Sequence, residues 1–248
     1  MTQAPGNALR ASGLRRGLAA FGAAGLAAAG TSAVVAPSAE AVPKRQRLVQ
    51  LLNDHGARSA PKGSARRVMN VPGRRPLTRV RTVLPELDRV EARNGKSWVR
   101  VALPGRPNSS TGWIKAAGTV PTYTPWSLSV GLNSRTVSVY RNGKRVRRYS
   151  AVVGAPSTPT PRGRFFVEEA LALGSQEAGG PFALATSARS NVLQEFNGGP
   201  GQIAIHGRNY LGDPLGTAAS HGCIRLTTKA ITWLSARIGA GVPLVVRQ

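Results

Sequence analysis

The strongest constraint on this chain is a series of short alternating segments separated by turn residues, which predicts a fold made mainly of β-strands. Apolar residues alternate with polar ones at Trp126, Leu128 and Val130 and again at Val137 and Val139, and a period of two is typical of strands. The further strand and turn signals in this half of the chain are Asn142-Gly143, residues 145–153, 165–167, 182–185, 203–205 and 244–246.

A single convincing helix is predicted close to the end of the chain. Thr227 or Thr228 can cap its first turn, and Gly239 can end it. The apolar residues expected on its buried face are Ile231, Leu234 and Ile238. Residues 126–248 are therefore expected to form a mainly β domain with one capping helix.

The preceding part of the chain is expected to contain a basic linker and a small β-module. We expect residues 42–76 to be a basic, loop-like linker, with a possible short helix over 47–53 in which Leu48, Leu51 and Leu52 share a face. Short strands then follow at Trp98-Val-Arg-Val and Gly112-Trp113-Ile114, with the hairpin signal Asn94-Gly95 just before them. Residues 77–120 thus resemble an SH3-like bacterial β-barrel, and residues 121–125, rich in Pro and Thr, are expected to be a linker.

The first 41 residues have the organisation of a secretory signal. Arg10, Arg15 and Arg16 precede an Ala- and Gly-rich apolar run, which leads to the small-residue site Ala39-Glu40-Ala41. The alternative is an uncleaved membrane anchor. We expect cleavage, and hence an exported protein of the cell wall or extracytoplasmic space without stable membrane insertion.

The charge of the chain restricts its surroundings, and export changes which partners are plausible. There are 34 Lys and Arg against 10 Asp and Glu, a formal net charge of +24, which favours polyanionic partners. Export makes nucleic acid an unlikely partner and leaves anionic cell-wall polymers as candidates. A chain with one Cys cannot form an internal disulfide. In an exported protein this thiol is therefore an intermolecular link, a reactive group or a small buried hydrophobe.

The motif that carries chemistry surrounds this cysteine. His206-Gly207 is followed by Ser220-His221-Gly222-Cys223-Ile224-Arg225, so two of the three histidines lie close to Cys223 in sequence. A catalytic thiol needs a base or an electropositive setting, and we therefore expect the pKa of Cys223 to be lowered. Gly222 allows backbone N–H groups to approach a developing oxyanion. Zinc is a poorer interpretation, because one Cys, two His and Asp213 do not make a closed site.

On these residues the segment 126–247 resembles the L,D-transpeptidase catalytic domain of the YkuD family. Val153-Gly154-Ala155-Pro156 and the stretch 158–165 support the resemblance, although Arg162 stands where Thr is often found. The resemblance implies a β-sandwich or barrel in which Cys223 attacks a donor tetrapeptide stem of peptidoglycan and releases D-alanine. It implies that His206 is the base and that Gly207 orients it. No metal or cofactor is implied.

The same resemblance assigns the remaining site residues and the second substrate. Gly222 and Cys223 would form the oxyanion hole. His221, as one of the catalytic residues, and Ser220, as a substrate-binding residue, would shape the site. Arg225 would hold the cysteine loop or a substrate carboxylate. An amine of an acceptor stem would then attack the thioester. The same cysteine would be acylated by carbapenems.

Several alternatives stay open or are disfavoured at this point. Water as acceptor would make the enzyme a carboxypeptidase, and a protein amine would make it an anchoring transpeptidase. A non-enzymatic wall-binding protein is a third possibility. NlpC/P60 peptidases place Cys before His, whereas no His follows Cys223 here. Sortases are disfavoured by the short distance between His206 and Cys223 in sequence.

Overall fold

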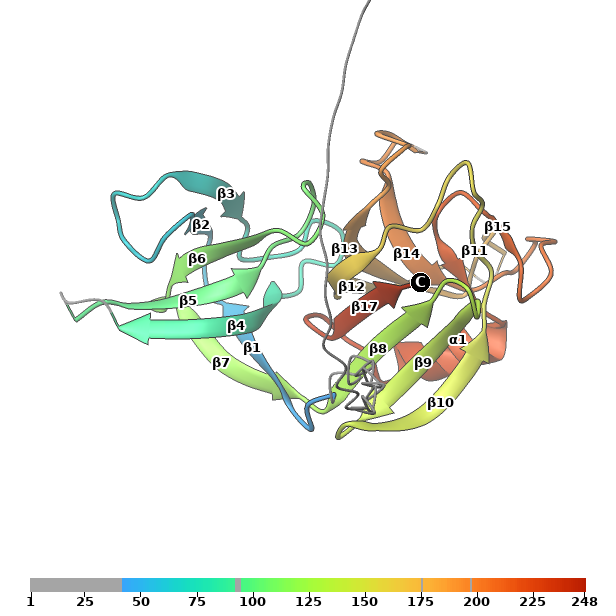
Figure 1. The fold of residues 1–248 in the computed structure, drawn as a ribbon, viewed down its shortest axis with the longest axis horizontal. Helices are drawn as coiled ribbons and strands as arrows, with labels where there is room; N and C mark the ends of the chain where they lie inside the picture. Colours follow the sequence, from blue (N-terminus) through green and yellow to red (C-terminus); the bar gives the residue numbers. More distant parts are fainter. Residues whose placement is uncertain (1–41, 92–94, 175, 197) are drawn as a thin grey trace, which may run out of the picture. The chain divides into compact units, whose positions relative to one another are not determined.

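The computed structural model describes residues 42–91, 95–174, 176–196 and 198–248, so the expected signal segment lies outside the described residues. Strands make up about half of the described chain, and one helix is found in it (Figure 1). This confirms the prediction of a mainly β fold with a single late helix. Among the described residues, no helix has the length and apolar character needed to cross a membrane.

The first region of the molecule, residues 46–124, is one antiparallel sheet of strand order β3-β2-β6-β5-β4-β1-β7 (Figure 1). Its strands are β1 (Gln46–Leu51), β2 (His55–Arg58), β3 (Arg67–Val71), β4 (Val83–Glu91), β5 (Ser97–Ala102), β6 (Thr111–Lys115) and β7 (Thr119–Thr124). The sheet encloses a core of its own, in which Val49, Leu51, Val99 and Ile114 are fully buried.

The expectation of a basic linker over residues 42–76 is wrong, as is that of a short helix over 47–53. This segment supplies β1, β2 and β3, because Val49 and Leu51 alternate into the core while Leu52, which the helix would bury, is 45% exposed. The expected linker at 121–125 is also mostly strand, since β7 pairs with β1 from Gln46↔Thr124 to Leu51↔Thr119.

The strands expected at 98–101 and 112–114 are confirmed as β5 and β6. β4 and β5 form an antiparallel pair around the expected Asn94-Gly95 turn, in which Asn94 is not described and Gly95 has a φ of 71°. The sheet extends beyond residues 77–120 at both ends, so the SH3-like interpretation of that segment stays a prediction.

The second region, residues 126–247, contains an eight-stranded sheet of order β10-β9-β8-β17-β12-β13-β14-β16 and a parallel pair, β11-β15. Its strands are β8 (Trp126–Gly131), β9 (Thr136–Arg141), β10 (Lys144–Ser150), β11 (Val153–Gly154), β12 (Gly163–Ala172), β13 (Phe182–Arg189), β14 (Gln202–His206), β15 (Ala218–Ser220), β16 (Ile224–Arg225) and β17 (Pro243–Arg247). Asn142 and Gly143, with φ values of 51° and 77°, make the expected hairpin turn between β9 and β10.

The helix α1 (Thr228–Ser235) closes the core of the second region. Thr227 is its N-cap, since its side chain accepts the N–H of Ala230 at 3.2 Å. The helix ends at Ser235, before the expected Gly239. Ile238 is nevertheless 1% exposed, because the chain after the helix stays against the same core as Ile231 and Leu234.

Side chains of both regions meet at β12. Phe166 of this strand packs into the core of the first region, while its neighbours Phe165 and Val167 face the core of the second, as alternation along a strand requires. Glu168 is fully buried between Arg75 of the first region and Arg189 of the second, and pairs with both. Charge and packing therefore connect the two regions.

Candidate active site

The motif residues come together because β14 and β16 run parallel and adjacent. The register pairs Ile205 with Ile224 and His206 with Arg225. Ile205 and Ile224 are fully buried on one face, so alternation places His206 and Arg225 on the opposite face. Cys223 directly precedes β16, and its sulfur contacts the backbone N–H of Ala204, two residues before His206 in β14. The pairing of β14 with β16 thus brings together the segments that carry the expected nucleophile and base.

The sulfur of Cys223 lies against the backbone of β14. The N–H of Ala204 donates to Sγ at 3.4 Å, and the carbonyl oxygen of Gln202 lies 4.0 Å from Sγ. The residue keeps some exposed surface, but desolvation of the sulfur raises the pKa of the thiol, and the Ala204 N–H only partly offsets it. The expectation of a lowered pKa is wrong for this state, in which the thiol stays protonated.

His206 is held as a neutral base with a defined tautomer. Its Nδ1 lies 2.7 Å from the carbonyl oxygen of Gly207. A carbonyl only accepts, so Nδ1 carries the hydrogen and Nε2 has the free lone pair. Burial lowers the pKa of His206, and this outweighs the bond to Gly207, which raises it. The imidazole is therefore neutral at neutral pH and ready to take a proton.

Close approaches that only glycine allows surround His206. A Cβ on Gly207 would lie 1.9 Å from the carbonyl oxygen of Gly180, and one on Gly179 would lie 2.7 Å from Nδ1 of His206. Gly179 also has a φ of 86°, in the left-handed region that favours glycine. The segment before β13 therefore packs directly on the imidazole and its neighbour. Gly207 has the orienting contact expected of it.

Ser220 closes the turn that presents the cysteine. Its Oγ donates to the carbonyl of Cys223 at 2.6 Å and accepts the N–H of Gly222 at 3.2 Å. Ser220 is fully buried, so the expectation that it contacts substrate is wrong in this state, and it instead shapes the turn. The N–H of Gly222, expected in the oxyanion hole, is engaged by Ser220. Gly222 itself has a φ of 114°, which explains the need for glycine.

Two threonines from the segment between β11 and β12 hold the cysteine turn from behind. Thr160 Oγ1 donates to the carbonyl of Gly222 at 2.7 Å and accepts the N–H of Gly154 at 2.9 Å. Thr158 Oγ1 donates to the carbonyl of Ser220 at 3.0 Å. The carbonyl of Gly222 and the N–H of Cys223 belong to one planar trans peptide and point in opposite directions. Thr160 therefore fixes the direction of the Cys223 N–H.

Arg225 is tied to the loop between β14 and β15. Its guanidinium pairs with Asp213, and its backbone exchanges hydrogen bonds with Val152 at 2.9 and 3.0 Å. Its Nε is buried and has no hydrogen-bond partner among the described residues. Burial lowers the pKa of Arg225, although the group stays charged at neutral pH. This arrangement supports the expected role in holding the cysteine loop.

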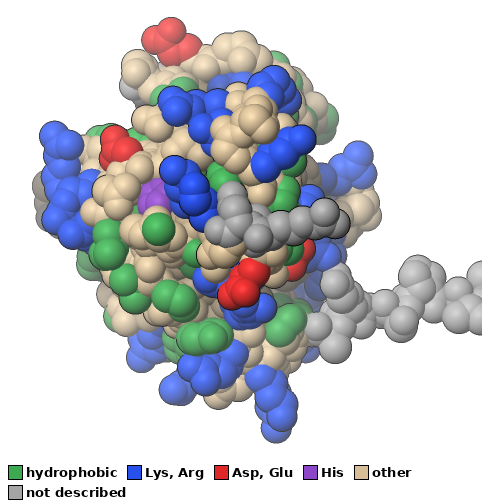
Figure 2. Space-filling view, turned by 90° about the vertical axis from the view of Figure 1, so that its left-hand side faces the viewer, with side chains coloured by type: hydrophobic (Ala, Val, Ile, Leu, Met, Phe, Trp, Pro, Cys, Tyr) green, Lys and Arg blue, Asp and Glu red, His purple; other side chains and the backbone are tan. Residues whose placement is uncertain are grey.

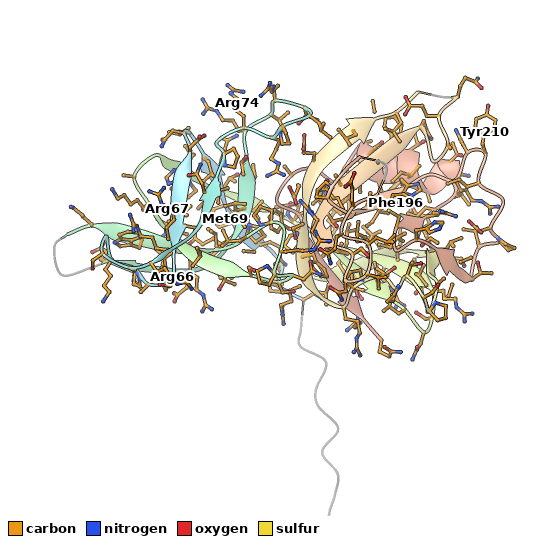
Figure 3. The ribbon with its side chains drawn as sticks, turned by 90° about the horizontal axis from the view of Figure 1, so that it is seen from above. Arg66, Arg67, Met69, Arg74, Phe196 and Tyr210 are labelled. Atoms are coloured by element: carbon orange, nitrogen blue, oxygen red, sulfur yellow. The ribbon has the colours of Figure 1, made fainter. Side chains whose placement is uncertain are left out.

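His221 lies at the exposed side of the turn. Its ring stacks on Phe196, with the ring centroids 5.4 Å apart and an interplanar angle of 29°. Phe196 is 44% exposed and comes from the segment between β13 and β14, whereas Tyr210 comes from the segment after β14 (Figure 3). His221 therefore lies at the edge of the site and stacks on an aromatic ring, whereas His206 is held by a backbone carbonyl.

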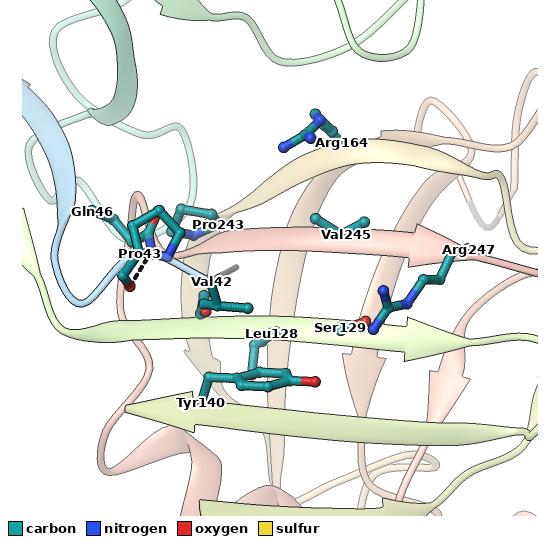
Figure 4. Close-up of a pocket in the computed structure, with 11 residues that line it drawn as sticks. Val42, Pro43, Gln46, Leu128, Ser129, Tyr140, Arg164, Pro243, Val245 and Arg247 are labelled. Atoms are coloured by element: carbon teal, nitrogen blue, oxygen red, sulfur yellow. Dashed lines mark hydrogen bonds between the residues drawn. The ribbon is translucent and has the colours of Figure 1, made fainter. Parts of the chain in front are cut away.

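Sequence reasoning missed the residues that hold the motif from a distance. Thr158 and Thr160 fall within the stretch 158–165 that supported the family resemblance, but nothing local indicates that their hydroxyls reach residues about sixty positions away. Gly179 gave no signal by itself. The cavity of about 210 Å³ shown in Figure 4 lies elsewhere, between residues 42–46 and β8, β9 and β17, and none of the candidate site residues lines it.

A thiol, a neutral imidazole and the oriented N–H of Cys223 are groups that a cysteine enzyme of acyl transfer uses. Residues 127–246 match the family model of the YkuD L,D-transpeptidase catalytic domain. Residues 127–246 are therefore an L,D-transpeptidase catalytic domain of the YkuD family.

The comparisons also find individual proteins to which this chain is similar. The chain is 28% identical over 146 residues to a putative L,D-transpeptidase YkuD of Bacillus licheniformis. The alignment covers 56% of this chain and 80% of the relative. It is 24% identical over 148 residues to that of Bacillus subtilis, at 60% and 74% coverage. Among solved structures, an L,D-transpeptidase from Mycobacterium smegmatis is 19% identical, with a TM-score of 0.38 and coverage of 62% and 91%.

Proposed function

We propose that this protein cross-links peptidoglycan stems through a thioester on Cys223, with His206 as general base and acid. The observation that carries the proposal is the position of the Cys223 sulfur against Ala204 of β14, the strand that ends at His206, together with the contact from Nδ1 of His206 to the carbonyl oxygen of Gly207 at 2.7 Å. This contact leaves Nε2 as the only ring nitrogen able to accept a proton.

In the first half-reaction Nε2 of His206 takes the thiol proton as Sγ of Cys223 attacks the carbonyl carbon of the third stem residue. The tetrahedral intermediate collapses, the peptide C–N bond breaks, and the proton on His206 passes to the leaving amine of D-alanine. The raised pKa of Cys223 means that proton transfer accompanies attack, because a preformed thiolate is disfavoured in the free enzyme.

In the second half-reaction an acceptor amine attacks the thioester while His206 takes one of its protons. The C–S bond breaks, and the proton returns to Sγ, which restores the starting state. The N–H of Cys223, whose direction Thr160 fixes, is the proposed oxyanion donor in both steps. Arg225, tied to Asp213, keeps the strand that carries the nucleophile in place.

The proposed surroundings follow from the sequence. The signal-like residues 1–41 support export to the cell wall, where donor and acceptor stems occur. The net charge of +24 supports anionic wall polymers as additional partners. Residues 77–120 are proposed as an SH3-like binding module and residues 126–248 as the catalytic domain. Carbapenems are proposed as acylating inhibitors of Cys223, since they react with the same nucleophile.

The test is intact-mass spectrometry of the wild type beside Cys223→Ala, first with a disaccharide-tetrapeptide and then with a carbapenem. We expect a mass gain on the wild type alone, together with released D-alanine and dimeric muropeptides. Release of D-alanine without dimers would indicate a carboxypeptidase, and a link to a protein amine would indicate an anchoring enzyme. The absence of any adduct would overturn the enzymatic proposal in favour of wall binding.

A further inference from the structure

Three hollows of about 490, 310 and 230 Å³ lie on the first region and at its boundary with the second, and no residue of the active site lines them. The first two share Pro72, Arg74 and Arg79 in their walls. The second and third share Asn53 and Asp54. Neighbouring hollows are therefore adjacent, and we call the three together the basic groove.

Cations line the basic groove along its whole length. They are Arg75 and Arg189 in the first hollow, Arg74 and Arg79 at the first junction, Arg81 in the second hollow, and Arg58, Arg67 and Lys115 in the third. Lys and Arg side chains are spread over this side of the molecule, with few acidic ones (Figure 2). Arg66, Arg67 and Arg74 are seen on the first region in Figure 3.

The acids in the groove do not neutralise its outer cations. Glu168 is fully buried and pairs with Arg75 and Arg189. Asp54 accepts the N–H of Gly73 at 2.8 Å. Within the described part of the chain, no ion pair involves the six remaining cations, which are Arg58, Arg67, Arg74, Arg79, Arg81 and Lys115. Their charge is available to a ligand.

Three of these guanidinium groups are oriented by backbone carbonyls. Arg58 donates to the carbonyl of Ala65 and Arg74 to that of Arg79, each at 2.7 Å. Arg81 donates to the carbonyl of Leu52. A carbonyl uses one of five N–H donors and leaves the positive charge in place. Because these guanidinium groups are already oriented, binding an anion costs less conformational entropy. Because they keep their charge and their other N–H groups, they can still donate to phosphate.

We propose that the basic groove binds a linear, phosphodiester-linked polymer of the cell wall and thereby docks the enzyme beside its substrate. A small anion would occupy one hollow, whereas cations that continue through three hollows fit a ligand of repeated charge. The choice of a wall polymer over nucleic acid rests on the proposed function, which places the protein in the wall. The proposal that this surface recognises phosphate groups depends only on the residues of the basic groove, not on the proposed function.

The test measures binding of poly(glycerol phosphate) to the whole protein at several salt concentrations. The groove variant is Arg67→Gln, Arg74→Gln and Arg79→Gln together. Its matched control is Lys144→Gln, Arg145→Gln and Arg148→Gln on the exposed strand β10, which removes the same charge from another place. We expect Kd to rise at least tenfold more in the groove variant, and its salt slope to fall by about 3, since each lost phosphate contact lowers it by about 1.

Each other outcome bears on the proposal. Equal weakening in the two variants would overturn it, because binding would then follow net charge alone. Equal affinity for monomeric glycerol phosphate would overturn the linear polymer, and equal affinity for single-stranded DNA would overturn the choice of a wall polymer. Carbapenem acylation of the same samples reports on Cys223 separately, so a failed groove and a failed active site give different results.

Discussion

The two regions of this molecule use their residues in different ways. In the second region the site is built from contacts that admit no extra atom: a Cβ would lie 1.9 Å from a carbonyl oxygen at Gly207 and 2.4 Å from one at Gly154. In the first region the proposed site is built from charge, and Arg67 and Arg79 are exposed and form no ion pair with the residues that the structure describes. A catalytic reaction requires the reacting groups to be held in fixed positions, whereas charged side chains can attract a polyanion even when they move.

The regions are nevertheless joined through β12. Phe166 belongs to the core of the first region, and Glu169 accepts both the N–H and the Oγ1 of Thr78 at 2.8 Å. We infer that the two regions unfold together although their functions separate. Substitutions can therefore be ordered by whether they affect chemistry alone, both regions, or only the fine geometry of one.

The largest effect on chemistry is expected from Cys223→Ala. Acylation should disappear, because no other thiol is present in the chain. Stability should change by less than about 1 kcal/mol, since a small, partly exposed side chain is lost. Binding of poly(glycerol phosphate) should stay unchanged. Intact-mass spectrometry and thermal unfolding measure the two effects, and an adduct on this variant would remove Cys223 as the nucleophile.

The largest effect on both regions is expected from Glu168→Ala. It leaves Arg75 and Arg189 buried without their shared carboxylate, and breaking a buried pair costs about 3–5 kcal/mol. Urea unfolding measures the loss. Glu195→Ala, at an exposed glutamate, is the control and should change stability by less than about 0.5 kcal/mol.

Hydrogen exchange shows whether this loss is shared. If protection falls in β12 and β13 but not in β3 and β4, the regions unfold separately and the inferred coupling is wrong. A loss in all four strands would confirm it, because a cooperative unit opens as a whole.

The same contrast explains how far sequence alone could go. Cys223, His206 and Gly207 can be predicted as site residues because their motifs are local in the sequence. The sequence does not predict β1, because Leu48, Leu51 and Leu52 fit a helical face, and only pairing with β4 and β7 establishes the strand. The nine basic residues between 44 and 75 favour a linker, although Arg47, Arg58 and Arg67 lie on β1, β2 and β3.

The contacts that hold the cysteine turn and the imidazole of His206 in position could not be predicted from the sequence for another reason. Thr160 reaches Gly222 and Gly179 reaches His206 only after the sheet has formed, so no local pattern encodes them. The raised pKa of Cys223 is of the same kind. It depends on how many atoms surround the sulfur, whereas the sequence shows only which titratable residues are near in the chain.

An intermediate effect is expected from Thr160→Val, which keeps the shape but loses the donor to Gly222. The Cys223 N–H should lose its fixed direction, and acylation by a carbapenem should slow by about 10- to 100-fold, below the ~10²–10³ for outright loss of an oxyanion donor. Alkylation by iodoacetamide, which develops no oxyanion, should be unaffected. Stopped-flow or time-resolved mass spectrometry measures both rates.

Thr160→Ser keeps the hydroxyl and is the matched control, with acylation expected within a few-fold of wild type. Thr186→Val removes another buried hydroxyl, which donates to the carbonyl of Ile203 at 2.7 Å, and reports the general cost of such a loss. Equal slowing of acylation and alkylation by Thr160→Val would show that the hydroxyl only supports the fold.

The smallest expected effect is a displacement of the pH profile, and it separates the two titrating groups of the second region. Burial lowers the pKa of His206, so the acid limb of acylation should lie below the ordinary histidine value of about 6.5. Burial raises the pKa of Cys223, so the inflection of iodoacetamide alkylation should lie above the ordinary thiol value of about 8.5. The signs agree, because burial disfavours the charged form of each group. An alkylation inflection well below 8.5 would mean that His206 and Cys223 exist as an ion pair, and proton transfer would then precede substrate binding.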